Sequence, residues 1–324
     1  ELISEREDPE TALHGVQTRR GIENFRISKY HLCEYPLFIN ALAITKMGAA
    51  MANFELGLLT EEQANAILRA CKEILEGKHH DQFPVDMIQG GAGTTTNMNA
   101  NEVIANRALE LMGHKRGEYQ YCSPNDQVNR PQSTNDAYPT AIHIGMYYTH
   151  LKLVKHFKEV IDAFRRKGEE FAHVIKMGRT QLEDAVPMTL GQTFNGFASI
   201  LQDEVKNLDF AAQDFLTVNM GATAIGTGIT AEPEYASKCI AALRKITGLD
   251  IRLADDLIGA TSDTSCLVGY SSAMRRIAVK MNKICNDLRL WHPARVAGWA
   301  KSICRPCSPV RPLCRVRSIR LFPK

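Results

Sequence analysis

The sequence predicts a mainly α-helical protein, in which a mixed helical N-terminal domain precedes a bundle of long helices. Apolar residues recur at spacings of three, four and seven along three long stretches, which is typical of amphipathic helices. We find no alternating series of apolar and polar residues long enough to predict a substantial sheet. Turn residues interrupt the helical pattern often before residue 136 and rarely after it.

The predicted N-terminal domain spans residues 1–135. Within it, Glu61–Leu75 and Met98–Met112 carry apolar residues at helical spacing and are each predicted to form a helix. The turns between such segments are rich in Gly, Ser, Thr and Asn. We therefore expect short helices joined by turns rather than a continuous bundle in this part of the protein.

The predicted bundle spans residues 136–290. One apolar stripe runs from Ile142 to Phe164, a second from Leu190 to Leu208, and a third from Tyr270 to Leu288. Helices with such stripes are stable only when the stripes face one another. We interpret the Met and aromatic residues of the stripes as bundle core rather than as a cofactor site.

Composition limits the class of protein. With 44% hydrophobic and 23% charged residues, the chain is ordinary for a globular protein, and no uninterrupted apolar run approaches the roughly 18 residues of a membrane span. The cysteines up to residue 285 are widely scattered, which is typical of reduced thiols. These features predict a cytoplasmic protein without membrane contact.

The last residues differ from the rest. Residues 291–324 contain six Arg and two Lys and no Asp or Glu, so residues 1–290 are mildly acidic although the whole chain has a formal net charge of +3. We predict that this basic tail is unstructured. Zinc binding by the tail cysteines is disfavoured because Cys304, Cys307 and Cys314 lack a well-spaced fourth ligand, and nucleic-acid binding is disfavoured because the tail lacks aromatic interleaving.

Three blocks of the body place hydroxyls and amides beside glycine or a turn. They are Gly90–Asn97 (GGAGTTTN), Ser133–Asp136 (STND) and Gly178–Gln181 (GRTQ). The first two run into a helical pattern, where free backbone N–H groups and the helix dipole attract an anion. Pro139 is expected in the first turn of the second helix. Together the blocks predict a site for a small anion such as a carboxylate.

Each block also has a simpler interpretation. Ser133–Asn135 could only cap a helix, the glycines could only form a turn, and Arg179 could pair with Glu183 or Asp184. No dinucleotide loop, nucleophile elbow or metal-binding cluster competes with the three blocks. The sequence therefore predicts neither a cofactor nor a metal.

The same blocks closely resemble the aspartase/fumarase superfamily. The resemblance extends from about Gly15 (GVQTRRGIENFRIS) to Leu290 (KMNKICNDLRL). Gly117–Tyr121 (GEYQY), Val218–Ile229 (VNMGATAIGTGI) and Gly178–Gln192 (GRTQLEDAVPMTLGQ) are similar to its aspartase branch. Gln181 stands where fumarases usually carry His, which favours the same branch.

The resemblance implies a fold, an activity and a set of site residues. It implies a homotetramer held together through the long-helix bundle, with active sites built from three subunits. The implied reaction removes ammonia reversibly from L-aspartate, gives fumarate through an aci-carboxylate intermediate, and needs no cofactor. By this resemblance the substrate-binding residues are Thr94, Ser133, Thr134, Asn135, Thr180 and Gln181, whereas Asn125 and Asp126 lie in a turn without a clear role.

One part of the family pattern is missing. The family's base is a serine in a loop with the signature GSSIMPGKVNP, which this sequence lacks after Leu290. Codons for Ser308–Arg320 can be chosen so that a one-base shift encodes PGSSIMPGKVNP. We therefore hypothesise that a frameshift near Trp291 replaced this loop. It would leave the protein truncated at its C-terminal end, with an incomplete bundle and no catalytic base in the sequence as written.

Two other functions stay open from the sequence. The first is a fumarase-type lyase, which would form fumarate from malate rather than from aspartate. The second is a non-catalytic structural homologue that keeps the bundle without the reaction.

Overall fold

The computed structural model describes residues 12–89, 91 and 93–291, and these form two compact units. The first unit contains residues 12–149 and 213–264, and the second contains residues 150–212 and 265–291. This division differs from the domain boundary expected after residue 135. Helix α5 (Thr134–Glu170) continues unbroken past that point, and residues 213–264 return to the first unit.

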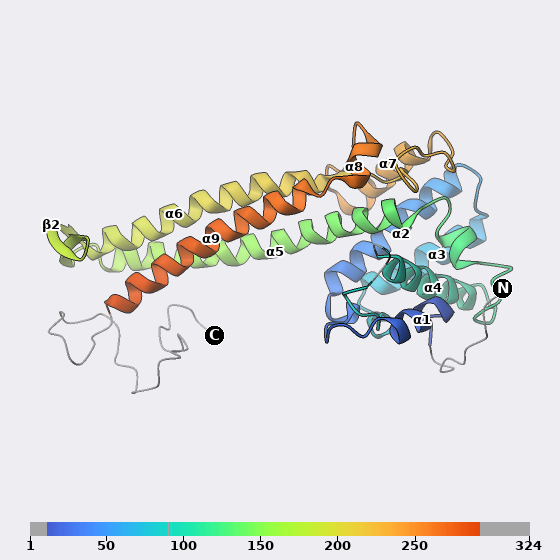
Figure 1. Cartoon of the computed structure of the whole chain (residues 1–324), viewed down its shortest axis with the longest axis horizontal. Helices are drawn as coiled ribbons and strands as arrows, with labels where there is room; N and C mark the ends of the chain where they lie inside the picture. The colour runs from blue at the N-terminus through green and yellow to red at the C-terminus, as the bar shows by residue number, and fades with distance from the viewer. Residues whose placement is uncertain (1–11, 90, 92, 292–324) are drawn as a thin grey trace. The chain divides into compact units, whose positions relative to one another are not determined.

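The first unit is built around helix α2 (Pro36–Glu55), which packs against α3 (Glu61–Leu75), α4 (Thr94–Leu111) and α7 (Tyr235–Thr247) (Figure 1). Because α2 has neighbours on several sides, it is apolar nearly all round. The unit also contains α1 (Val16–Asn24), the short helices η1 (Leu32–Glu34), η2 (His80–Gln82), η3 (Pro124–Val128) and η4 (Gln213–Leu216), α8 (Leu257–Ser262), and the parallel strand pair β3 (Thr217–Val218) and β4 (Arg252–Leu253).

Helix α2 qualifies the prediction about apolar runs. It is 20 residues long and apolar enough to cross a membrane by length and composition alone. Its apolar run is not continuous in the sequence, because Asn40, Thr45 and Lys46 interrupt it. Most of α2 is buried within the first unit, as expected of a core helix.

The predicted helix at Glu61–Leu75 is confirmed residue for residue. Thr60 caps it, since its Oγ1 accepts a hydrogen bond from the Gln63 backbone N–H and the Gln63 side chain accepts one from the Thr60 N–H. This reciprocal capping is encoded within four neighbouring residues. The start of the helix could therefore be found from the sequence.

Helix α4 begins at Thr94, four residues before the predicted start at Met98. Gly93 precedes it with a φ of 91°, and a Cβ atom there would lie 2.5 Å from the ring of Tyr138. Only glycine is compatible with both the left-handed backbone and this close approach. The early start places the Thr residues of the first block in the first turn of α4.

The second unit consists of the part of α5 after Thr149, α6 (Leu190–Ala212), α9 (Ser265–Leu290) and one hairpin. The three predicted stripes are confirmed as three long helices, and α6 and α9 lie side by side (Figure 1). Phe164, Phe194 and Phe197 pack as an aromatic cluster with ring centroids 5.8–6.2 Å apart. Trp291 also contacts this cluster, 5.9 Å from Phe197.

The hairpin was not predicted. Strands β1 (Ile175–Thr180) and β2 (Glu183–Thr189) pair antiparallel around Gln181 and Leu182, whose φ angles are 52° and 70°. Two left-handed residues match the twist of the paired strands, but neither is glycine or asparagine. Both strands are mostly exposed, so they lack the apolar alternation that would reveal a strand.

Candidate active site

Ser133, Thr134 and Asn135 form the front of helix α5, as predicted. The Ser133 Oγ accepts a hydrogen bond of 3.1 Å from the Asn135 backbone N–H, and the Ser133 N–H donates one of 2.9 Å to Asp136 Oδ1. The capping interpretation is therefore confirmed for Ser133. Capping does not prevent ligand binding here, because Ser133 and Thr134 are only half-buried and Asn135 is exposed.

Pro139 lies deeper in the helix than expected. Because α5 begins at Thr134, Pro139 falls within the helix rather than in its first turn. Proline has no N–H, so the Asn135 carbonyl lacks its usual helical donor. The side chain of Asn219 replaces that donor, with Nδ2 at 2.9 Å from the Asn135 oxygen.

Asp136 ties the front of α5 to the segment that follows Val218. Its Oδ2 accepts hydrogen bonds from the backbone N–H groups of Gly221 (3.2 Å) and Thr223 (2.9 Å). Burial raises the pKa of Asp136 to about 6, against the lowering effect of these hydrogen bonds. Asn135 Nδ2 also donates to the Ala224 carbonyl at 2.7 Å, so the VNMGATAIG segment is part of the same site.

Thr94 stands at the front of α4 and is exposed. Its Oγ1 donates a 2.6 Å hydrogen bond to the Gly91 carbonyl, which closes the glycine turn. Asn97, which the sequence also suggested as a ligand donor, is buried. Its Nδ2 donates to Asn129 Oδ1 at 3.1 Å and lies 3.4 Å from Thr134 Oγ1, so it links the two helix fronts instead.

Sequence reasoning missed Lys46. This lysine of α2 is 1% exposed, and its ammonium donates to the side-chain oxygens of Asn97, Asn129 and Gln132 at 2.8–2.9 Å. Burial lowers the pKa of Lys46 to about 7. A lysine in the otherwise apolar stretch LAITKMGAAMA was the available signal, since a buried amine needs polar partners.

Thr180 and Gln181 lie at the turn of the β1–β2 hairpin in the second unit, and both side chains are exposed. The predicted pairing of Arg179 with Asp184 is confirmed at 3.0 Å. The first unit thus brings together Thr94, Ser133, Thr134 and Asn135 through the Asn97 link, whereas Thr180 and Gln181 belong to the other unit.

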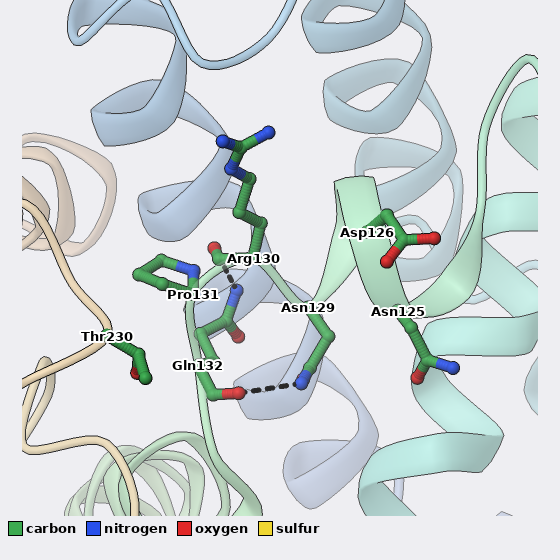
Figure 2. A pocket seen from close by; sticks show the side chains of 7 residues that line it. All are labelled: Asn125, Asp126, Asn129, Arg130, Pro131, Gln132 and Thr230. Atoms are coloured by element: carbon green, nitrogen blue, oxygen red, sulfur yellow. Dashed lines mark hydrogen bonds between the residues drawn. The ribbon is translucent and has the colours of Figure 1, made fainter.

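A hollow of about 310 Å³ lies beside the segment that leads into α5. Figure 2 shows Asn125 and Asp126 of η3 on one side of it and Thr230 on the other. Asn129 Nδ2 donates to the Gln132 carbonyl at 2.8 Å, and Gln132 Nε2 donates to the Arg130 carbonyl at 3.2 Å, which holds this turn closed on itself. The hollow is lined by Asn125, Asp126, Asn129, Arg130, Pro131, Gln132 and Thr230.

Among the described residues, no group of three or more His, Cys, Asp or Glu side chains is placed to hold a metal ion. Cys304, Cys307 and Cys314, and the whole frameshift hypothesis, fall outside the described residues. The site in the first unit therefore consists of hydroxyls, amides and helix N-termini, with one buried ammonium behind them.

This arrangement can be compared with known proteins. The lyase family matches residues 4–304 of the chain. The chain belongs to this lyase family. The match continues past Leu290, where the resemblance was expected to stop, and it covers both units of the described structure.

The curated relatives of this lyase point to one branch of the family. Aspartate ammonia-lyase of Escherichia coli (strain K12) is 52% identical over 299 residues, and that of Helicobacter pylori (strain ATCC 700392 / 26695) is 51% identical over 298. Each alignment covers 92% of this chain. The chain spans about 63% of the length of the first relative and 64% of the second.

Solved structures confirm the mainly helical fold of this lyase. The chain matches fumarate lyase:delta crystallin from Brucella melitensis, bound to cobalt, with a TM-score of 0.88 and 47% identity over 92% of this chain and 65% of that one. It matches class II fumarase from Schistosoma mansoni with a TM-score of 0.86 and 29% identity, over 96% of this chain and 68% of that one.

Proposed function

We propose that this chain is an aspartate ammonia-lyase, whose reaction is the reversible elimination of ammonia from L-aspartate to give fumarate. The observation that carries this proposal is the 52% identity to an aspartate ammonia-lyase over 92% of the chain. The fumarase-type alternative fits less well, because the fumarase that matches is 29% identical. The substrate-binding residues we propose are Thr94, Ser133, Thr134, Asn135, Thr180 and Gln181.

The geometry of the first unit supports carboxylate binding. Thr94 and Ser133–Asn135 lie at the fronts of α4 and α5, where the positive ends of the helix dipoles and polar side chains favour an anion. The costly species of the reaction is the aci-carboxylate that forms when a base removes the proton from the carbon beside one carboxylate. Preorganised hydroxyl and amide donors stabilise this developing charge before ammonia leaves.

We assign the base to no residue of this sequence, since the serine loop of the family has no match in it. The proposal for this protein is therefore dicarboxylate binding, with negligible turnover by the sequence as written. No cofactor or metal enters the proposed reaction. The scattered free cysteines among the described residues agree with a cytoplasmic location, which we also propose.

We further propose that the protein assembles as a homotetramer through the second unit. Several large apolar side chains of its helices are exposed in the single chain, including Phe210 at 82%, Val268 at 63% and Val279 at 62%. Exposed apolar residues gathered on long helices favour protein–protein contact. The expected partner is a second copy of this protein, as the family resemblance implies.

The test measures binding and turnover separately. Calorimetric titration of the purified protein with fumarate is expected to show binding, and Thr94→Val is expected to weaken it about tenfold by removing one donor to a charged group. The matched control is Thr264→Val, which removes the same hydroxyl from an exposed position of the first unit. Turnover is followed by the ultraviolet absorbance of fumarate, with L-aspartate or L-malate as substrate.

The outcomes separate the three functions. Fumarate binding that depends on Thr94 supports the proposal, and formation of fumarate from malate but not from aspartate would replace it with the fumarase-type reading. A stable oligomer that binds neither fumarate nor aspartate would favour the non-catalytic structural homologue.

A further inference from the structure

The ammonium of Lys46 controls the orientation of the amides around it. An ammonium group has three N–H donors and no acceptor, so each neighbouring amide must turn its oxygen toward it. Lys46 Nζ lies 2.8 Å from Asn97 Oδ1, 2.9 Å from Asn129 Oδ1 and 2.8 Å from Gln132 Oε1. Its three donors are thus matched by three amide oxygens inside the first unit.

Asn97 is the amide that reaches the proposed site. Because its Oδ1 faces Lys46, its Nδ2 must point the other way, toward Asn129 Oδ1 at 3.1 Å and Thr134 Oγ1 at 3.4 Å. A flipped carboxamide would place its NH₂ group against the ammonium. The buried position of Asn97 leaves no water to compensate such a clash.

Thr134 is the last residue in this series of contacts. Its Oγ1 accepts from Asn97, so the single hydroxyl proton of Thr134 is directed away from Asn97 and is available as a donor. The 3.4 Å distance is long for a hydrogen bond, but catalytic contacts often tighten when ligand binds. A carboxylate accepts hydrogen bonds and donates none, so the direction of this proton decides whether Thr134 can bind it.

We propose that Lys46 is a positioning residue, which acts through Asn97 to set the hydrogen-bond direction at Thr134 so that its hydroxyl donates to the substrate carboxylate. The inference rests on the proposed function, because Thr134 is a binding residue only if the site takes a carboxylate. Lys46 does not touch the ligand in this proposal. Its effect is carried by the sequence of contacts from ammonium to Asn97 oxygen, from Asn97 nitrogen to Thr134 oxygen, and from the Thr134 hydroxyl to the ligand.

The other two amides keep the arrangement rigid. Asn129 and Gln132 belong to the turn that leads into α5, and Figure 2 shows them joined within it. Gln132 Nε2 donates to the carbonyls of Val128 (3.0 Å) and Arg130 (3.2 Å). The ammonium therefore holds α2, α4 and the turn before α5 at one point, which keeps Asn97 and Thr134 at a constant separation.

The deciding substitution is Asn97→Asp, which keeps the size and the oxygen that faces Lys46. It replaces the donor that faces Thr134 with an acceptor, so the Thr134 hydroxyl must turn back and donate to the new carboxylate. We expect fumarate to bind the full-length protein about 10- to 100-fold more weakly, as for loss of a hydrogen bond to a charged group. The control Asn129→Asp adds the same charge beside Lys46 without contacting Thr134, and is expected to weaken binding less.

A double-mutant cycle separates the relay from general damage to the site. In a Thr134→Val background no hydroxyl remains to be turned, so Asn97→Asp is expected to have little further effect on fumarate binding. If the two substitutions weaken binding independently, the relay is wrong. Thermal melting of each variant shows whether the fold is retained, and Thr134→Ser is expected to restore binding because it keeps the hydroxyl.

A spectroscopic readout tests the relay even if fumarate does not bind. In ¹⁵N-labelled protein, Lys46→Met is expected to shift the side-chain amide resonances of Asn97, because nothing then prevents the carboxamide from flipping. Unchanged Asn97 resonances in a folded Lys46→Met variant would overturn the inference. Absence of fumarate binding by the wild-type protein, with the Asn97 shift present, would instead count against the proposed function alone.

Discussion

Asp136 Oδ2 accepts a 2.9 Å hydrogen bond from the backbone N–H of Thr223, a residue held in the left-handed region with a φ of 58°. This contact joins the front of α5 to a segment that is distant in the sequence but adjacent in the first unit. Since Asp136 also accepts from the Ser133 N–H at 2.9 Å, one buried carboxylate positions two parts of the proposed site.

The first prediction concerns the pH dependence of stability. The pKa of Asp136 is about 6 in the folded protein against an ordinary value of 3.8, so folding favours its protonated form. Its contribution to stability is complete below about pH 3.8 and is lost as the pH rises through about 6. Lys46 titrates above this window, since burial lowers its pKa only to about 7.

Urea denaturation at pH values across this window measures the effect. The free energy of unfolding of the wild type is expected to fall more between pH 4 and pH 6 than that of Asp136→Asn, which has no group to titrate there. The exposed control Asp255→Asn is expected to keep the wild-type slope. An Asp136→Asn variant with the full wild-type slope would show that another group is responsible.

The second prediction concerns Glu102, a buried carboxylate of α4 that caps α1. It accepts hydrogen bonds of 2.6–3.0 Å from the backbone N–H groups of Gly15, Gln17 and Thr18 and from the Thr18 hydroxyl. Glu102→Gln turns one acceptor into a donor and is expected to lower the free energy of unfolding by about 1–3 kcal/mol. Amide exchange in Val16–Asn24 should quicken.

The exposed Glu232→Gln is the matched control for Glu102, because it makes the same chemical change at the surface of the first unit. It is expected to change stability by less than about 0.5 kcal/mol. Equal effects of the two substitutions would mean that the cap contributes nothing.

The third prediction is an asymmetry at Glu204 in the second unit. Glu204 is 1% exposed and pairs with Arg276 at 3.0 Å and Lys280 at 2.6 Å, whereas both cations reach solvent. Replacing Glu204 by Leu leaves two solvated cations and is expected to change stability little. Replacing Arg276 and Lys280 together by Met leaves a buried, unpaired carboxylate and is expected to cost about 3–5 kcal/mol.

Chemical denaturation of the two variants at neutral pH gives the comparison. A larger loss for Glu204→Leu than for the double cation variant would reverse the expected order. That result would mean that the ion pairs stabilise α6 against α9 by more than the carboxylate's desolvation costs.

The fourth prediction concerns assembly. Phe210 of α6 is 82% exposed in the single chain, and the proposed tetramer would bury it. Phe210→Asp is expected to lower the molar mass measured by light scattering during gel filtration, whereas Phe210→Leu should keep the wild-type mass. A wild-type protein that is monomeric at all concentrations would contradict the proposed assembly.

Local patterns in the sequence were sufficient for the helices and for the donors at their fronts. Thr60 and Gln63 mark the start of α3 within four residues, and Ser133–Asp136 marks the start of α5 in the same way. The hairpin at Ile175–Thr189 was missed because its exposed strands have no apolar alternation. Pro139 was placed one turn too early because its missing N–H is compensated by Asn219, a distant residue.

The sequence by itself determined the mainly helical fold, the family resemblance and the carboxylate-binding residues proposed at the fronts of α4 and α5. Helical periodicity and capping act between residues a few positions apart, so they can be read directly. Only the tertiary structure decided the roles of Lys46 and Asp136, whose contacts with Asn97 and Thr223 span 51 and 87 positions. Burial makes these contacts strong, and burial depends on how the helices pack rather than on any local pattern.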